Sequence, residues 1–221
     1  MDKFVLYLDI MGFKERVNRT SIEELEKQLL FFKTKNNKLK PLLEGKDNKK
    51  LIDMAQFSDS IVLVSVGGGV EDLNRICKAA VILMQTALET GFALRGAIAK
   101  GQMVFEKENQ LFFGKALVDA YLLEEELCYY GVVFHESMEE IVSNVINGNK
   151  YYPIEDIVIP LKKGKSKHYH VAWHKMTAKL AKGDISSDAT IWLRDLRKTV
   201  SGNPRVYLDN TIAIIESSEN K

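Results

Sequence analysis

The strongest constraint on the fold is an apolar run near the N-terminus that ends in an acid. The run FVLYLDI covers residues 4–10, and Asp9 is its only charged residue. A short run with β-branched and aromatic residues is typical of a strand that is buried on both faces. The turn-prone residues MGF follow at once. The sequence therefore predicts a central strand over residues 3–10 that delivers Asp9 to one edge of a sheet.

A second acid stands in a similar context. Residues 51–66, LIDMAQFSDSIVLVSV, contain two apolar runs that are interrupted by FSDS. This pattern predicts a β-hairpin with Ser58 and Asp59 at its turn. In a β-α-β-β arrangement the first strand and the hairpin are neighbours, so Asp9 and Asp59 should meet at one edge of the sheet. Two close carboxylates repel each other and are costly to bury unless a cation lies between them.

The paired acids indicate a metal site, although each acid alone has a simpler explanation. Asp9 can cap a turn, and Asp59 can belong to a hairpin loop. Taken together with Gly12 and Arg95, the two acids favour a site. Hard oxygen ligands suit Mg²⁺ or Mn²⁺, and a pair of such ions can hold the attacking and leaving oxygens of a phosphoryl transfer. The backbone N–H groups that follow Asp9 can contact phosphate.

The remaining pattern predicts an α+β fold with an antiparallel sheet and helices on one face. The order of predicted elements is a strand, a helix, the hairpin, an amphipathic helix that Gly91 ends, and a strand with its return. A helix, a short strand, a further helix and two strands follow. We interpret residues 33–50 as the end of the first helix and a solvated loop. The predicted catalytic domain covers residues 1–174, and residues 175–221 form a helical extension packed on the same domain.

Composition narrows the possible partners. The formal net charge of the 221 residues is +1, so no overall basic field points to a nucleic-acid partner. No apolar run approaches the roughly 20 residues that span a bilayer, and no signal peptide precedes the first strand. Cys77 and Cys128 form no CxxC pair, so we expect both to be reduced. These features predict a cytoplasmic protein without a membrane partner.

Four segments together resemble a known family. LDIMGF, FSDSIV, LRGAIAKG and FFGKALVDAYLLEEEL, in this order over residues 3–134, are similar to the class III nucleotide cyclases. The resemblance is closest to the bacterial Pycsar antiphage pyrimidine cyclases. The late segment PRVYLDNTIAII is similar to the C-terminal end of those enzymes. The resemblance implies the ferredoxin-like fold of a class III cyclase homology domain.

The resemblance also implies roles for particular residues. The metal set comprises Asp9, the backbone carbonyl of Ile10, and Asp59, which would hold two Mg²⁺ or Mn²⁺ ions per site. The loop that wraps the triphosphate matches Gly12, Phe13 and Lys14. Arg95 matches the arginine of a glycine-containing strand and is expected to contact phosphate during catalysis.

The sequence departs from the purine cyclases where the base is read. Those enzymes carry a lysine four residues before the second metal aspartate, and Ala55 stands there in this chain. The loss of the lysine argues against ATP or GTP and fits a pyrimidine pocket. By this reasoning Ala55, Gln56 and Phe57 lie near the base. UTP and CTP both remain open as the substrate.

A second departure concerns the helix after FFG. The asparagine and arginine of the family are absent there, and Asp119 or Tyr121 would take over part of the nucleotide-binding role. Arg95, Lys100 or one of the lysines of residues 161–167 are the candidates to replace the missing arginine.

The resemblance implies an enzyme that makes cyclic UMP or cyclic CMP and releases pyrophosphate. In the family the active site forms between two subunits, so a homodimer with two sites is expected. The product would act as a second messenger on a separate cyclic-nucleotide-responsive effector protein in antiviral defence. Two alternatives remain: a non-catalytic nucleotide-sensing or dimerisation module of the same fold, and a two-metal nucleotidyl transferase with a linear product.

Overall fold

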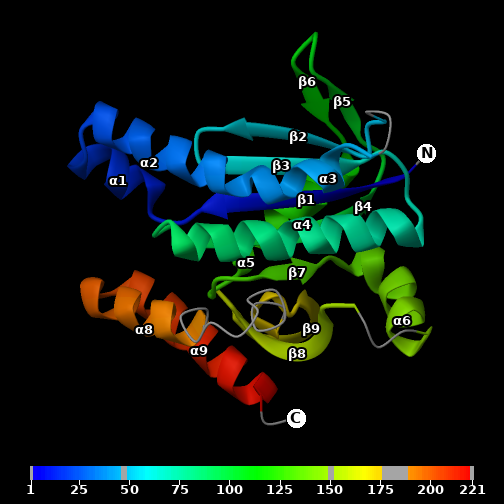
Figure 1. The fold of residues 1–221 in the computed structure, drawn as a ribbon. Coiled ribbons are helices and arrows are strands. Elements are labelled where there is room, and N and C mark those ends of the chain that lie inside the picture. The colour runs from blue at the N-terminus through cyan, green and yellow to red at the C-terminus, as the bar shows by residue number, and fades with distance from the viewer. Residues whose placement is uncertain (1, 46–48, 149–151, 176–188, 220–221) are drawn as a thin grey trace.

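The computed structural model describes residues 2–45, 49–148, 152–175 and 189–219. A seven-stranded sheet in the order β2-β3-β1-β4-β7-β9-β8 forms its centre, and a β5–β6 hairpin projects away from it (Figure 1). The strands are β1 (Lys3–Ile10), β2 (Ile52–Phe57), β3 (Ser60–Ser65), β4 (Leu94–Gly101), β5 (Val104–Glu106), β6 (Leu111–Phe113), β7 (Val132–Phe134), β8 (Ile154–Leu161) and β9 (Gly164–Val171). The parallel pairing of β4 with β7 is the exception in a mostly antiparallel sheet.

β1 is a central strand because it is buried on both faces, as its apolar run predicts. Its partners are β3 and β4, both antiparallel. Leu6 and Leu8 point into the main core, whereas Val5 packs on the other face with Ala116. The side chains of successive strand residues alternate between the two faces. The predicted central strand is therefore confirmed.

Helices cover both faces of the sheet, which differs from the prediction of helices on one face. The helices are α1 (Phe13–Arg19), α2 (Ile22–Lys35), α3 (Lys40–Leu43), α4 (Val70–Glu89), α5 (Lys115–Glu126), α6 (Glu139–Gly148), α8 (Ala189–Thr199) and α9 (Asn203–Glu219). α4 crosses the face of the main core, whereas α5 packs against β1 and β4 on the opposite face. The α+β class with a mostly antiparallel sheet is confirmed.

The α4 helix shows why this region folds as the pattern predicts. Leu73, Ile76 and Met84 are buried on one helical face. The Asp72 carboxylate accepts from the Gly69 N–H at 3.2 Å and so satisfies a donor at the start of the helix. Gly91, with φ +75°, follows the end of the helix and permits the left-handed turn found there.

The segment after α2 is more ordered than the predicted solvated loop. A 3₁₀ turn (Asn36–Leu39) and α3 continue from α2, and Leu39 is 2% exposed. The many lysines suggested solvent, but Leu39 anchors the segment in the main core. The prediction was therefore wrong for this segment.

The C-terminal helices join the same core. Leu193 of α8 and Leu208 of α9 are fully buried in the cluster that contains α4. Residues 176–188 and 220–221 of the predicted extension lie outside the described residues. Within the described ranges, no helix combines the length and the apolar composition that crossing a bilayer requires.

Candidate active site

The backbone joins the two acid-bearing segments. The predicted hairpin is present, and its turn holds Ser58 with φ +53°. The N–H of Ile10 donates to the carbonyl of Asp59 at 2.9 Å. On the other side of β1, the N–H of Met11 donates to the carbonyl of Ala93 at 2.9 Å. The end of β1 is thus held between the hairpin turn and the start of β4.

Asp9 is a partly buried carboxylate whose surroundings disfavour its charged form. Burial, and secondly the neighbouring charge of Asp59, raise the pKa of Asp9 to about 6, although the positive charge of Arg95 opposes the shift. Neither Asp9 nor Asp59 has a side-chain hydrogen bond or ion pair within the part of the chain that the structure describes. Two neighbouring carboxylates without a donor can accommodate a divalent cation, which would supply positive charge.

The described residues contain no group of three or more His, Cys, Asp or Glu side chains placed to hold a metal ion. A metal at this site would therefore rely on the two aspartates, on main-chain carbonyls such as that of Ile10, and on the oxygens of a bound substrate. Mg²⁺ tolerates this composition because it is commonly held by one or two carboxylates together with substrate phosphates. The donor set fits the predicted ions.

Arg95 lies opposite Asp9 in the β1–β4 register and is 8% exposed. Its guanidinium group is held by other protein groups. Nε donates to Oε1 of Glu124, and Nη1 donates to the carbonyl of Leu127 at 2.9 Å and to the hydroxyl of Tyr207 at 3.3 Å. Arg95 therefore connects β4 with α5 and α9. Its predicted contact with phosphate stays a prediction.

Glu124 is a functional candidate that the sequence interpretation missed. Three adjacent acids such as those of residues 124–126 usually form a solvated helix face, but Glu124 is 2% exposed. Burial raises the pKa of Glu124 to about 7 despite the attraction of Arg95. Ala116, Ala120 and Glu124 follow each other at intervals of four and share the buried stripe of α5. This spacing was the available signal.

A polar and aromatic cluster adjoins the acids. The hydroxyls of Tyr7 and Ser60 are 2.8 Å apart and share a hydrogen bond. The rings of Tyr7 and Tyr121 meet edge to face with centroids 5.5 Å apart. Hydrogen bonding to Glu125 raises the pKa of Tyr121, to which the charge of Asp9 also contributes. The structure thus brings Tyr121 to the acids, and adds Tyr7 and Ser60, which we did not predict.

Asp119 is not brought to the acids of its own chain. Its carboxylate accepts from Nζ of Lys115 at 2.6 Å, one turn earlier in α5. It lines a separate pocket of about 300 Å³ with Leu122 and His135. A role of Asp119 in nucleotide binding stays a prediction and would require a second subunit.

The predicted triphosphate loop has one buried and two exposed members. Gly12 adopts φ +73° and forms the N-terminal cap of α1, a conformation that favours glycine. Lys14 is exposed on α1. The side chain of Phe13 is 9% exposed and belongs to the main core, so the Phe13 ring does not contribute to a phosphate site.

The predicted base-contacting residues lie on the edge strand β2. Phe57, Ser60, Asp9 and Arg95 form one row across β2, β3, β1 and β4, because each is the register partner of the next. The Phe57 side chain is 85% exposed. Ala55 pairs with Val62, which pairs with Tyr7, so Ala55 shares the face of the Tyr7–Tyr121 pair.

Comparison with known proteins gives a likeness of fold. No protein-family model matches the sequence, and no curated protein matches it. A bacterial light-regulated adenylyl cyclase superposes with a TM-score of 0.52 at 10% identity, covering 78% of this chain and 52% of the other. This chain therefore corresponds to about half the length of that protein.

Two further solved structures have lower scores. They are an adenylate/guanylate cyclase/hydrolase from Silicibacter pomeroyi and a class III adenylyl cyclase-like ATP-binding protein from Pseudomonas aeruginosa. The first has a TM-score of 0.45 at 15% identity and covers 77% of this chain and 95% of the other. The second has a TM-score of 0.46 at 13% identity and covers 82% and 40%. At these identities the comparisons speak for the cyclase fold alone.

Proposed function

We propose that the chain is a nucleotide cyclase that converts UTP or CTP to the 3′,5′-cyclic nucleotide and pyrophosphate. The observation that carries this proposal is the pair Asp9 and Asp59. A main-chain hydrogen bond from Ile10 brings the two segments together at the end of β1, in a cyclase-like fold. Neither carboxylate has a donor among the described residues, and burial, followed by the charge of Asp59, raises the pKa of Asp9. A divalent cation would offset both effects.

In the proposed reaction the ribose 3′-oxygen bonds to the α-phosphorus, and the bond from this phosphorus to the bridging oxygen breaks. Pyrophosphate leaves with the electron pair, and the hydroxyl proton passes to solvent. Two bound Mg²⁺ or Mn²⁺ ions would supply the positive charge that activates the hydroxyl and stabilises the leaving group. Asp9 and Asp59, with the Ile10 carbonyl, would hold these ions. The turn at Gly12 would orient the triphosphate.

Arg95, the β4 register partner of Asp9, would act through its positive charge. Its charge opposes the rise in the pKa of Asp9 and so keeps that carboxylate available as a ligand near neutral pH. Glu124 and Tyr207 hold the guanidinium group in its place. In this arrangement Glu124 and Tyr207 are positioning residues that act through Arg95.

Residues on β2 and exposed apolar side chains support the proposed base preference and the proposed homodimer. Ala55 stands where the purine cyclases carry a lysine, and it lies with Phe57 on the edge strand β2, which supports a pyrimidine substrate. Phe57 is 85% exposed, and Phe113, Val118 and Leu122 are 57%, 52% and 54% exposed. Exposed apolar side chains on the α5 face fit contact with a second copy. The proposed homodimer would bring Asp119 of one copy toward the acids of the other.

A non-catalytic nucleotide-sensing or dimerisation module is the second candidate. Arg95 favours it, because the hydrogen bonds to Glu124, Leu127 and Tyr207 engage Nε and Nη1 and leave only Nη2 for a phosphate. The paired acids argue for catalysis, since a binding module gains nothing from their mutual repulsion. The cyclase therefore remains the leading proposal. Its physiological product would be a second messenger read by a separate effector in antiviral defence.

The decisive experiment offers ATP, GTP, CTP and UTP separately to the purified chain with Mn²⁺ and with Mg²⁺. Mass spectrometry then measures cyclic nucleotide and pyrophosphate. We expect a cyclic product from UTP or CTP that depends on the metal and on Asp59. Retention of the wild-type rate by Asp59→Asn would contradict the metal site. A linear product would favour a nucleotidyl transferase.

A further inference from the structure

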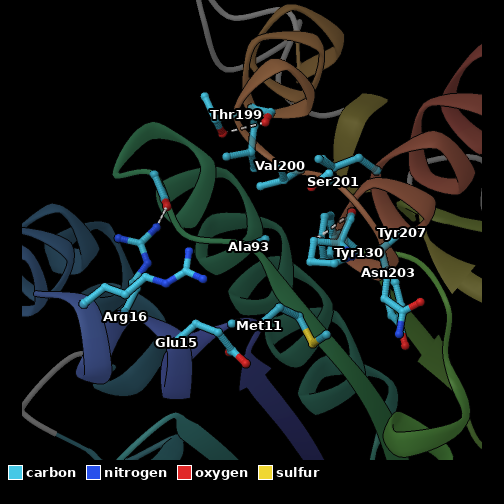
Figure 2. A pocket seen from close by; sticks show the side chains of 16 residues that line it. Met11, Glu15, Arg16, Ala93, Tyr130, Thr199, Val200, Ser201, Asn203 and Tyr207 are labelled. Atoms are coloured by element: carbon cyan, nitrogen blue, oxygen red, sulfur yellow. Dashed lines mark hydrogen bonds between the residues drawn. The ribbon is translucent and has the colours of Figure 1, made fainter.

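A pocket of about 760 Å³ lies between α1, the start of β4 and the C-terminal helices α8 and α9 (Figure 2). Its wall includes Gly12, Arg16, Arg19, Ser201, Asn203 and Tyr207. Asp9 and Asp59 do not line it, so the pocket excludes the two acids, although it adjoins the turn at Gly12. Its volume is within the range of small-molecule sites in proteins. Most of the wall opposite α1 comes from the C-terminal helices, for which the proposed reaction provides no direct role.

The α1 wall is basic. Arg16 has a fixed orientation, because Nη1 donates to Oε1 of Gln28 at 3.0 Å, Nη2 donates to the carbonyl of Gly91, and Cζ lies 4.4 Å from the centre of the Phe92 ring. A guanidinium group has five N–H donors, so donors remain for a ligand. Arg19 has no hydrogen bond or ion pair with any other residue in the described ranges, and its side chain is exposed.

The charge balance of the lining favours an anion. Glu15 is the acidic side chain among the lining residues and stands against the two arginines, so the lining carries a net charge of +1. Guanidinium groups bind phosphate and carboxylate with paired hydrogen bonds, and they bind phosphate more readily than lysine does when planar recognition matters. The basic wall therefore suits the phosphate end of a ligand.

The opposite wall offers aromatic and polar groups. The rings of Tyr130 and Tyr207 lie 5.9 Å apart at an interplanar angle of 32°, and Tyr207 is partly exposed toward the pocket. Ser201 and Asn203 are exposed polar residues at the junction of α8 and α9. A ring can stack on the tyrosine while its polar atoms bond to these side chains.

We propose that this pocket binds a small organic phosphate of nucleotide size at a site separate from the metal centre. The phosphate contacts Arg16 and Arg19, and the ring or sugar lies against Tyr207. The ligand spans the cyclase-like core on one side and the C-terminal helices on the other.

The same walls connect the pocket to the metal site. Gly12 lies three residues after Asp9, at the turn where β1 passes into α1. Tyr207 accepts a hydrogen bond from Arg95, and Arg95 is the register partner of Asp9. A ligand on Gly12 and Tyr207 would thus touch one residue that follows Asp9 along the chain and one that is linked to Asp9 through Arg95. Regulation of turnover by the ligand rests on the proposed function, whereas binding does not.

Isothermal titration calorimetry with AMP and with UMP in EDTA tests binding without the metal site. We expect at least one nucleotide to bind the full-length chain, and Arg19→Glu and Ser201→Trp to weaken binding by about tenfold or more. Lys27→Glu is the matched charge reversal on exposed α2, outside the pocket, and should bind as the wild type does. Asp59→Asn should also bind normally.

Three results would overturn the proposal: no binding of either nucleotide by the wild type, unchanged binding by both pocket variants, or loss of binding in Asp59→Asn. Melting temperature and circular dichroism verify that the variants fold. With a nucleotide that binds, the rate of cyclic product formation should change at least about twofold in the wild type and not in Ser201→Trp. Normal binding without any cyclase activity would reject the proposed function and keep the pocket.

Discussion

Asp9 and Arg95 stand opposite each other on β1 and β4, yet the guanidinium group of Arg95 bonds to Glu124 instead of Asp9. The buried guanidinium group of Arg95 thus lies near both Asp9 and Glu124, and it donates its hydrogen bond to Glu124, the more deeply buried of the two acids. Glu124 is 2% exposed, so it has the greater need of a partner. Among the described residues no donor bonds to the Asp9 carboxylate, which leaves its oxygens available for the proposed metal.

Asp9→Asn should abolish turnover and stabilise the apoprotein. The folded protein keeps a proton on Asp9 up to about pH 6, whereas an unfolded chain releases it near pH 4. The folded state therefore binds more protons in this window, and Asp9 lowers the stability as the pH rises from about 4 to about 6. At about pH 7.5 the free energy of unfolding should increase by about 1 to 2 kcal/mol in Asp9→Asn, after a discount for solvent contact.

Urea unfolding at several pH values without metal measures this effect. The difference between wild type and Asp9→Asn should vanish below about pH 3, where the wild-type carboxyl is protonated in both the folded and the unfolded state. Asp195→Asn changes an exposed acid of α8 and serves as the control. A variant that is less stable than the wild type at neutral pH would show that Asp9 is not under repulsion.

Mn²⁺ should raise the melting temperature of the wild type and leave Asp9→Asn and Asp59→Asn unchanged. A ligand that binds only the folded state stabilises it by about 2.7 kcal/mol at a concentration 100 times its dissociation constant. Differential scanning fluorimetry across a Mn²⁺ titration measures the shift, with Ca²⁺ as a comparison. An equal shift in the double variant would place the ion elsewhere.

The Arg95–Glu124 pair should be more costly to break than to replace. Arg95→Met leaves the buried Glu124 without a partner and should destabilise the protein by about 3 to 5 kcal/mol. The double variant Arg95→Met with Glu124→Leu should recover most of this loss and still turn over slowly. Denaturant unfolding and kcat measure the two effects, and Glu126→Gln is the matched control on the same helix.

Denaturant unfolding and kcat together distinguish a packing role of Arg95 from a role in catalysis. If the double variant recovered both stability and kcat, Arg95 would serve packing alone. Tyr207→Phe removes one hydroxyl acceptor of Arg95, at 3.3 Å, and should lower kcat while leaving the fold intact.

Phe113→Asp should dissociate the proposed dimer. Phe113 is 57% exposed on the β5–β6 hairpin beside α5, and a charge there opposes apolar contact with a second copy. Light scattering at low micromolar concentration should give a dimer for the wild type and a monomer without activity for the variant. Lys107→Asp, in the turn of the same hairpin, tests the effect of charge alone. An active monomer would contradict a site shared between subunits.

The strands and the meeting of the acids are predictable because local patterns specify them. The apolar run of β1 and the FSDS interruption place Asp9 and Asp59 next to each other once the two elements pair. Glu124 escaped prediction because three adjacent acids suggest solvent, although the interval from Ala120 indicated burial. Tyr207 lies 112 residues from Arg95, and no local pattern reports a contact at such separation.

The hydrogen bond from Ile10 to Asp59 joins main-chain atoms of β1 and of the hairpin turn. Ala55 and Phe57 lie on the neighbouring edge strand and take no part in this bond. If β2 contacts the base as proposed, exchanges on β2 would alter which base is accepted and leave the proposed reaction chemistry in place. A single scaffold could then diversify its signals one substitution at a time.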